Sequence, residues 1–248
     1  MRQEPAVVLP ARLGSTRVKV KNLRKLNGVT LIDNMIEVLQ KTRTLKNIYI
    51  NSDSDLFASV AKRNNVKFYH RKPELATSAS LIDDYIYDFI KSVQPRYLAV
   101  VNPTSPFVSA ETLEAAWQYF LDNNFDTLLS CEKIQTHCFY QNKPVNFSIQ
   151  GKHPRSQDLE PVRALNFAIT IWNCDSYLAN YEANQYGVYT GKIGFFDIEG
   201  FGGIDIDYEE DFQLAEFVAR FLTNSEKFEA EYDELIAESV AEGVEFAN

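Results

Sequence analysis

Short hydrophobic runs alternate with amphipathic stretches through the first half of the chain. Clustered or alternating apolar residues predict strands at Ala6–Leu9, Asn47–Ser52, Val66–Tyr69, Tyr97–Val101 and Phe125–Cys131. Between them, apolar residues recur every three or four positions, which predicts helices at 31–39, 53–64, 80–93 and 111–121. Because strands and helices alternate, we expect an α/β fold with a mainly parallel sheet and helices on both faces.

The second half of the chain has a less regular pattern. Residues 135–158 are polar and include Pro144 and Pro154, so we expect hairpins or loops that project from the sheet. Later strands are predicted at Asn166–Trp172 and Lys192–Ile198, and a helix at Glu209–Leu222. We therefore expect one domain over residues 1–222, followed by an acidic tail over residues 223–248.

Composition narrows the class of protein. The chain has 248 residues, of which 45% are hydrophobic and 24% charged, as in a soluble globular protein. Its apolar runs are far shorter than the roughly 20 residues that span a bilayer, and its first residues do not form a secretory signal. Cys131, Cys138 and Cys174 lack the spacing of a disulfide framework or a zinc site. We expect a cytoplasmic protein without a membrane partner.

The charged residues are unevenly distributed. A net charge of −9 argues against nucleic acid as a partner. The segment from Arg12 to Lys25 nevertheless contains six basic residues and no acidic one, which indicates a local anion site. From Glu199 to the end, the chain has fifteen acidic residues and two basic ones. This acidic end indicates metal ligands, a solvated tail, or both.

The basic segment follows the first predicted strand. It therefore falls at the carboxyl end of the sheet, where open α/β folds bind ligands. Gly14 and Ser15 permit a tight turn whose backbone N–H groups can face a phosphate. Arg12 and Lys21 could neutralise a polyphosphate, although the spacing of a Walker loop is absent. From spacing alone, a solvated basic loop explains these residues equally well.

Asp205 and Asp207 form the second candidate site. On an extended segment the side chains of residues i and i+2 share one face, so these two carboxylates point the same way. They repel each other unless a cation lies between them, and Mg²⁺ prefers such oxygen ligands. The alternative is that Asp207 caps the following helix while Asp205 is merely exposed.

Three further segments carry polar candidates. Arg71 precedes the helix predicted to start at Ser80, and we expect Ser80 to cap that helix. Asn102 begins a Pro-rich turn directly after the apolar strand Tyr97–Val101. Arg155 and Arg163 have the forked donors that suit carboxylates or phosphates. Surface ion pairs with Asp158 or Glu160 would explain those two arginines as well.

Taken together, these segments resemble the acylneuraminate cytidylyltransferase family, which includes the CMP-sialic acid synthetases. The matching motifs occur in the family's order over about Ala6 to Phe221: LPARLGSTR with KN (9–17, 21–22), RKPELATSAS (71–80), NPTSPF (102–107), PR with VR (154–163) and GIDIDYEEDFQLAE (203–216). The resemblance implies a Rossmann-like nucleotidyltransferase core over residues 1–222, with helices on both faces of a mainly parallel sheet and a small dimerisation subdomain. It also implies a homodimer in which a segment at about 134–172 reaches the partner's active site.

The resemblance also implies roles for individual residues. Arg12, Ser15 and Lys21 would hold the CTP phosphates, and Arg12, Lys21 and Asp207 would be the catalytic residues. Asp205 and Asp207 would bind Mg²⁺. The other substrate-binding positions would be Ala11, Asn22, Arg71, Ser80, Asn102, Arg155 and Arg163. Of these, Asn22, Arg71 and Ser80 would contact cytosine and ribose, Asn102 the sugar, and Arg155 and Arg163 the acidic acceptor or the phosphates.

This chain departs from the family pattern at three places. Asn102 stands where the family often has Gln. The family's R-P-N-G-A-I-Y segment here has one residue added before Asn166 and has Phe167 in place of Gly. A lysine expected near His137 is missing. All three departures fall on the acceptor side, so CTP is better supported than any particular sugar.

The implied function is transfer of CMP from CTP to an acidic sugar of the sialic or ulosonic type. Mg²⁺ would assist, pyrophosphate would leave, and positioning with charge neutralisation would dominate catalysis. One alternative is the same transfer to a different acceptor, such as a phosphonate or another acid. A second alternative is a homologue that binds CTP without turnover.

Overall fold

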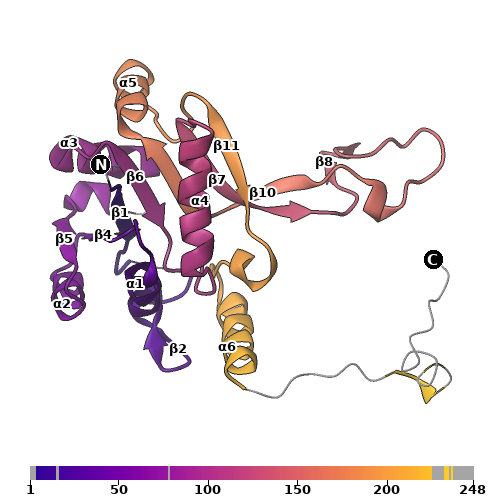
Figure 1. Cartoon of the computed structure of the whole chain (residues 1–248), viewed down its shortest axis with the longest axis horizontal. Coiled ribbons are helices and arrows are strands. Elements are labelled where there is room, and N and C mark those ends of the chain that lie inside the picture. The colour runs from indigo at the N-terminus through magenta and orange to yellow at the C-terminus, as the bar shows by residue number, and fades with distance from the viewer. Residues whose placement is uncertain (1–3, 15–16, 78, 225–231, 235, 237–248) are drawn as a thin grey trace.

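The computed structural model describes residues 4–14, 17–77, 79–224, 232–234 and 236. Its centre is a seven-stranded sheet with the order β11-β7-β10-β6-β1-β4-β5 (Figure 1). The strands are β1 (Ala6–Pro10), β4 (Asn47–Ser52), β5 (Lys67–His70), β6 (Tyr97–Val101), β7 (Thr127–Ile134), β10 (Val162–Asn173) and β11 (Ile193–Asp197). Six strands run in one direction, and β10 alone is antiparallel to its neighbours β6 and β7. The predicted mainly parallel sheet is confirmed.

Helices cover both faces of this sheet, as predicted. Helices α1 (Leu31–Lys41), α2 (Asp55–Arg63) and α4 (Ala110–Asp122) pack on one face, and α3 (Ile82–Val93) and α5 (Cys174–Asn184) on the other. Alternation along β1 explains the two layers, because Val7 and Leu9 enter the first core and Ala6 and Val8 the second. The parallel strands therefore end together at one edge of the sheet, and the candidate residues of the amino-terminal half follow those ends.

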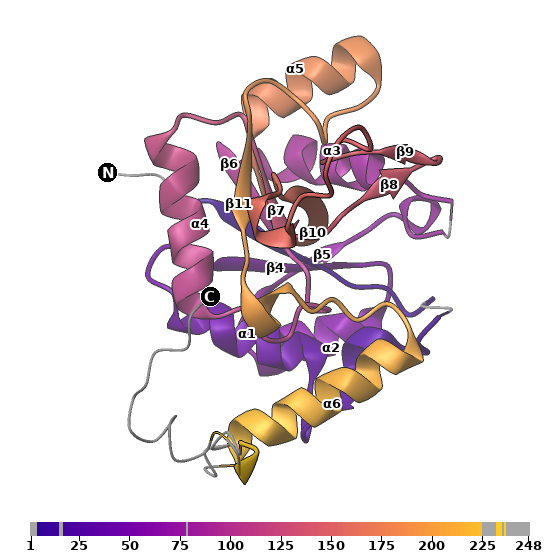
Figure 2. The same cartoon turned by 90° about the vertical axis from the view of Figure 1, so that its right-hand side faces the viewer.

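Helix α6 (Glu209–Thr223) is attached to the first layer rather than to the sheet (Figure 2). Its residues Phe212, Ala215 and Ala219 share a smaller core with Leu26 and with the start of α1. Leu26 belongs to a hairpin of β2 (Lys25–Leu26) and β3 (Val29–Thr30) that the sequence pattern did not predict. This packing brings the acidic segment near the carboxyl end of the chain against the basic segment near its start.

Two local predictions were wrong. The sequence pattern gave no helix at α5, because only Cys174 and Tyr177 of that helix are buried and no apolar stripe results. Ser80 does not cap α3, which starts at Ile82 after Leu81. Its hydroxyl accepts from the Thr77 N–H at 3.0 Å and donates to the Glu74 carbonyl at 2.9 Å, so it organises the preceding loop.

The segment between β7 and β10 projects away from the sheet (Figure 1). It contains β8 (Phe139–Tyr140), β9 (Lys143–Pro144) and a short 3₁₀ turn, in agreement with the predicted hairpins and loops. Its apolar side chains at Phe139, Tyr140, Val145 and Ile149 are exposed. Within the described ranges, none of the helices has the length and apolar character needed to cross a membrane.

Candidate active site

Three adjoining pockets follow the carboxyl ends of β1, β5 and β6. The first, of about 190 Å³, is lined by residues from Pro10 to Arg12 and from Arg71 to Tyr85. The second, of about 150 Å³, shares Arg12 with the first. The third, of about 660 Å³, shares Lys21, Thr104 and Asp207 with the second. The three pockets share lining residues and together form one cleft. We label its parts by the roles that the resemblance implies, as a nucleoside end, a phosphate section and an acceptor end.

Arg71 is the buried cation of the nucleoside end. It is only 4% exposed, and it donates from Nε to the Asn51 side-chain oxygen at 2.7 Å and from a terminal nitrogen to the Asn51 carbonyl at 2.9 Å. Its guanidinium lies over the Tyr85 ring at 4.1 Å. Burial lowers the pKa of Arg71, although an arginine stays charged at neutral pH. The planar group is thus held rigidly at the pocket wall.

Ala11 and Arg12 connect the nucleoside end to the phosphate section. Ala11 extends β1 by one hydrogen bond, from its N–H to the Asn51 carbonyl at 3.0 Å. Arg12 donates to the Thr77 carbonyl at 3.0 Å, which ties this strand end to the loop organised by Ser80. Ser80 lines the same pocket as Ala11 and Arg12. These sequence-predicted residues therefore meet at one place.

Asn22 and Lys21 lie at the start of a short 3₁₀ turn, Lys21–Leu23, in the phosphate section. The buried Asn22 amide donates to the Pro10 carbonyl at 3.4 Å, and its Oδ1 has no partner among the described residues. Lys21 reaches across to the acidic segment, where its ammonium contacts the Ile206 carbonyl and lies 3.2 Å from Asp207 Oδ1. Ser15 lies outside the described residues.

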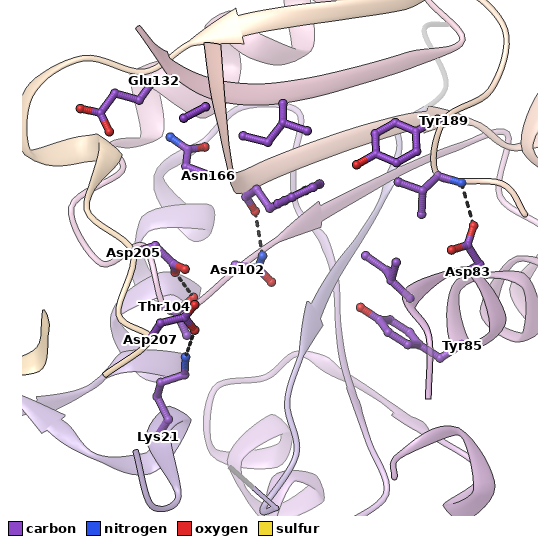
Figure 3. Close-up of a pocket in the computed structure, with 15 residues that line it drawn as sticks. Lys21, Asp83, Tyr85, Asn102, Thr104, Glu132, Asn166, Tyr189, Asp205 and Asp207 are labelled. Carbon is purple, nitrogen blue, oxygen red and sulfur yellow. Dashed lines mark hydrogen bonds and ion pairs between the residues drawn. The ribbon is translucent and has the colours of Figure 1, made fainter. Parts of the chain in front are cut away.

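Asp205 and Asp207 both line the acceptor end, as the i, i+2 spacing predicts (Figure 3). Ile206 between them is fully buried, and its N–H donates to the Thr104 carbonyl at 2.9 Å. The Thr104 hydroxyl donates to Asp205, which is mostly buried. Burial, reinforced by the charge of Asp207, raises the pKa of Asp205. A cation between the two carboxylates would relieve this cost.

Asp207 does not cap α6. The capping acceptor is the Asp211 carboxylate, which accepts from the N–H groups of Asp207 and Tyr208 at 2.9 and 2.7 Å. The Asp207 carboxylate instead forms a two-bond pair with Arg17, at 3.0 and 3.2 Å, in addition to its contact with Lys21. Of the two explanations that the sequence left open for Asp207, the capping role is therefore excluded.

The two aspartates fit a shared Mg²⁺ site in part. Their donors are carboxylate oxygens that open on one pocket next to basic residues. Mg²⁺ commonly takes one or two carboxylates together with substrate phosphates and water rather than a full protein cage. Among the described residues, no group of three or more His, Cys, Asp or Glu side chains is placed to hold a metal ion.

The acceptor end is built around an irregularity in β10. The register of β10 against β7 shifts between Leu165 and Thr170, and Phe167 in this bulge has a φ of 52°, in the left-handed region. The Asn102 amide donates to the Phe167 carbonyl at 2.7 Å (Figure 3). Asn166 uses its Oδ1 to accept from Ser130, and its buried Nδ2 has no partner among the described residues. Asn102, which the sequence pattern singled out, lines this pocket.

Arg155 and Arg163 line none of these three pockets within the described chain. Arg155 is an exposed residue that pairs with Asp158 at 2.8 Å, and Arg163 pairs with Asp197 at 3.2 Å. Asp197 is also held by Lys133 at 2.9 Å. Both arginines lie on the segment expected to reach a partner subunit, so their role in an acceptor site stays a prediction.

Sequence reasoning did not single out several residues that line the cleft: Arg17, Tyr85, Thr104, Glu132, Asn166 and Tyr189. Arg17 and Thr104 lie inside the motifs at 9–17 and 102–107. Their position in those motifs, close to Arg12 and Asn102, was the signal that could have identified them. Glu132 and Tyr189 come from β7 and from the loop before β11, where no motif marks them. Only the folded sheet places them opposite Asp205 and Asn102.

The fold and the cleft are those expected of a nucleotidyltransferase. A solved structure entitled CMP:2-keto-3-deoxy-manno-octonic acid synthetase complexed with CTP has the same fold, with a TM-score of 0.66 and 15% identity over 88% of this chain and 99% of that chain. The chain belongs to the cytidylyltransferase family, whose profile matches residues 6–239.

Curated relatives have low identity over most of the chain. An N-acylneuraminate cytidylyltransferase of Streptococcus agalactiae serotype V is 25% identical over 218 residues, which are 84% of this chain and 52% of the relative. The post-translational flagellin modification protein B of Campylobacter coli is 25% identical over 222 residues, 85% of this chain and 92% of that protein. The chain thus spans about half the length of the streptococcal relative.

Proposed function

We propose that this protein transfers CMP from CTP to a hydroxyl of an acidic sugar of the sialic or ulosonic type and releases pyrophosphate. The observation that carries this proposal is the single cleft in which Arg71, Arg12 with Lys21, and Asp205 with Asp207 follow one another. The large pocket shares Tyr85 with the nucleoside end and Lys21 with the phosphate section, so an acceptor bound there would adjoin the α-phosphate, which lies between the nucleoside and the leaving pyrophosphate. The names of the relatives support the substrates.

In the reaction, the acceptor oxygen attacks the α-phosphorus of CTP. The oxygen–phosphorus bond forms as the bond from the α-phosphorus to the bridging oxygen of the β-phosphate breaks, and the acceptor hydroxyl releases its proton to solvent water. Arg12 and Lys21 would offset the charge that develops on the leaving pyrophosphate. Arg71, fixed by Asn51 and Tyr85, would hold the nucleoside so that the phosphates lie in the phosphate section.

Asp205 and Asp207 would hold Mg²⁺. Such an ion supplies charge neutralisation at the phosphate oxygens and orients them for displacement. For the ion to bind, Asp207 has to exchange at least part of its pairing with Arg17 and Lys21. Those two cations would then be free to contact the phosphates, which couples nucleotide binding to the rearrangement of one carboxylate.

The projecting segment would form a homodimer contact that brings Arg155 and Arg163 to the partner's acceptor end. Its exposed apolar side chains at Phe139, Tyr140, Val145 and Ile149 support this, since burying them against a second copy would remove apolar surface from water. Replacing the exposed Ile149 with Glu is expected to convert a dimer to a monomer in light scattering, whereas Gln150→Glu on the next position serves as the matched control.

A cytoplasmic location would suit the three free thiols.

The proposal is tested by pyrophosphate release from CTP and Mg²⁺ with a panel of sialic acids, other ulosonic acids and small phosphonates. Release that depends on a sugar acid, with formation of the CMP conjugate in mass spectrometry, is the expected result. Release with a phosphonate but with none of the sugar acids would show that the acceptor is a phosphonate rather than a sugar acid. CTP binding in calorimetry without release for any acceptor would contradict CMP transfer and favour a homologue that only binds the nucleotide.

A further inference from the structure

Phe167 has a backbone conformation that a bulky residue seldom adopts. Its φ of 52° lies in the left-handed region, where only glycine avoids steric cost. Residues held in such conformations cluster at functional sites, because the surrounding structure has to maintain them. Phe167 lines the acceptor end, so the strain lies at the place where the second substrate would bind.

Neighbouring side chains maintain this conformation from both sides of β10. On the β6 side, Asn102 donates from Nδ2 to the Phe167 carbonyl at 2.7 Å and from its N–H to the Ala168 carbonyl at 3.0 Å. On the β7 side, Asn166 Oδ1 accepts from the Ala168 N–H at 3.3 Å and from the Ser130 hydroxyl at 2.6 Å. The bulge is thus fixed by dedicated hydrogen bonds, and the Phe167 ring is attached to a rigid backbone.

The surroundings of Phe167 show what its ring can contact. Tyr85 and Tyr189 lie on the side of the acceptor end opposite Asp205 and Lys21 (Figure 3), and Ile82 and Val188 also line the pocket. Among the residues that line this pocket, the only cation is Lys21, which already contacts Asp207. One side of the acceptor end therefore carries Lys21 and the two aspartates, and the other carries aromatic and apolar side chains together with Asp83, whose carboxylate accepts from the Gly187 and Val188 N–H groups. An aromatic wall suits the C–H face of a sugar ring or an apolar substituent.

We propose that Phe167 is a specificity-determining residue whose ring, on the wall of the acceptor end, limits the size of the acceptor. This inference rests on the proposed function, because it presumes that the large pocket receives the acceptor. The ring acts on the acceptor and not on CTP, since Phe167 lines neither the nucleoside end nor the phosphate section. It excludes larger acids by occupying volume, and it fits a smaller acid by contact.

Two variants separate the ring from the backbone strain. Phe167→Gly removes the ring and relieves the left-handed φ, whereas Phe167→Ala removes the ring and retains the unfavourable φ. Both variants are expected to shift the ratio of kcat/KM for a larger over a smaller sugar acid by about 10-fold or more toward the larger. KM for CTP should remain within about twofold of wild type, and the Gly variant should melt at a higher temperature than the Ala variant.

The outcomes distinguish this inference from the proposed function. Pyrophosphate release by a variant with an acid that wild type rejects would support the inference. An unchanged acceptor ratio in both variants, with active wild type, would overturn the inference alone and attribute Phe167 to structure. No release by any of the three proteins would overturn the size selection together with the proposed acceptor class. CTP calorimetry on the same samples would then show whether the protein binds CTP, as the proposed function requires.

Discussion

The nucleoside end and the acceptor end of the cleft are built in opposite ways. At the nucleoside end, parallel strands supply Ala11 and Arg71 directly after their last residues, and Arg71 is buried with two bonds to Asn51. At the acceptor end, the antiparallel strand β10 supplies a bulge with a strained Phe167 and an unpartnered Asn166 nitrogen. The first end is assembled before any ligand binds. Both ends keep a buried amide nitrogen without a partner among the described residues, Asn51 Nδ2 at the first and Asn166 Nδ2 at the second, so the difference lies in the backbone strain at Phe167.

This difference indicates where substrate preference can change. A regular edge of parallel strands offers little freedom, because each side chain follows from the sheet register. A bulge can exchange one residue without disturbing the other strands, since its conformation is fixed by local hydrogen bonds. We therefore expect the nucleotide preference to be robust toward substitution and the acceptor preference to be adjustable.

The largest effect is expected where the two ends meet. Asp207→Asn should lower turnover by about 100-fold or more, because it removes charge from the pair that would hold Mg²⁺ beside the reacting phosphate. The fold should persist, since the carboxylate is partly exposed and lies outside the helix cap. Pyrophosphate release measures the turnover, and thermal melting measures whether the fold persists.

Glu209→Gln is the matched control for that variant. Glu209 lies two positions further, pairs with Arg24 at 2.6 Å, and lines none of the three pockets. It loses the same charge and should retain near-normal turnover. A near-normal rate for Asp207→Asn would contradict the metal assignment and leave the acidic pair with a structural role.

An intermediate effect is expected at the nucleoside end. Arg71→Lys should weaken CTP binding by about 10-fold or more, because a hydrogen bond to a charged group contributes about 1.5–3 kcal/mol. It should also lower the free energy of unfolding by about 1–3 kcal/mol, because Asn51 loses its buried partner. Calorimetry with CTP and urea denaturation measure the two effects.

Arg63→Lys provides the comparison for Arg71→Lys. Arg63 makes an exposed ion pair with Asp33, away from the cleft, so the same substitution should alter stability by only about 0–1 kcal/mol and leave CTP binding unchanged. If both variants bound CTP as tightly as wild type, Arg71 would not contact the nucleotide, and the distinction between the two ends would fail.

The smallest effect is expected at the acceptor end. Asn102→Ala removes the donor that holds the Phe167 carbonyl, and it should reduce stability by about 1 kcal/mol. KM for the acceptor should rise about 5- to 10-fold, while the dissociation constant for CTP stays constant. A change in CTP binding equal to the change in acceptor KM would show that the two ends are not independent.

Asn123→Ala is the control for Asn102→Ala. Asn123 donates its side-chain amide to the Tyr119 carbonyl at 2.9 Å at the exposed end of α4, so the same type of bond is lost far from the cleft. The Asn123→Ala variant should therefore have the wild-type KM for the acceptor. Steady-state kinetics with both variants therefore separate the local role of Asn102 from a general loss of stability.

The sequence predicted most of the fold because its apolar periodicity is regular where strands are parallel. Strands β4 and β6 end where the pattern places them, and Asp205 and Asp207 share a pocket as their spacing requires. The bulge at Phe167 was not predictable from periodicity, since it depends on hydrogen bonds from Asn102 and Asn166 across two neighbouring strands. The resemblance marked the position as unusual without indicating its backbone conformation.

Neither helix α5 nor the contacts of Asp207 could be predicted from the sequence, and each has its own reason. Helix α5 buries too few side chains to leave a periodic signal. The pairing of Asp207 with Arg17 joins residues 190 positions apart, and it exists only because α6 packs against the hairpin after the basic segment. Long-range packing, rather than local propensity, therefore arranges the phosphate section.

The most direct test of the account follows one oxygen atom. The protein is incubated with CTP, Mg²⁺ and a sugar acid whose reacting hydroxyl carries heavy oxygen, and the products are analysed by mass spectrometry. The expected product is a CMP conjugate that retains the heavy oxygen between sugar and phosphorus, with one pyrophosphate released per conjugate. A conjugate without the label, or CTP binding with no conjugate from any acid, would contradict attack by the acceptor on the α-phosphorus.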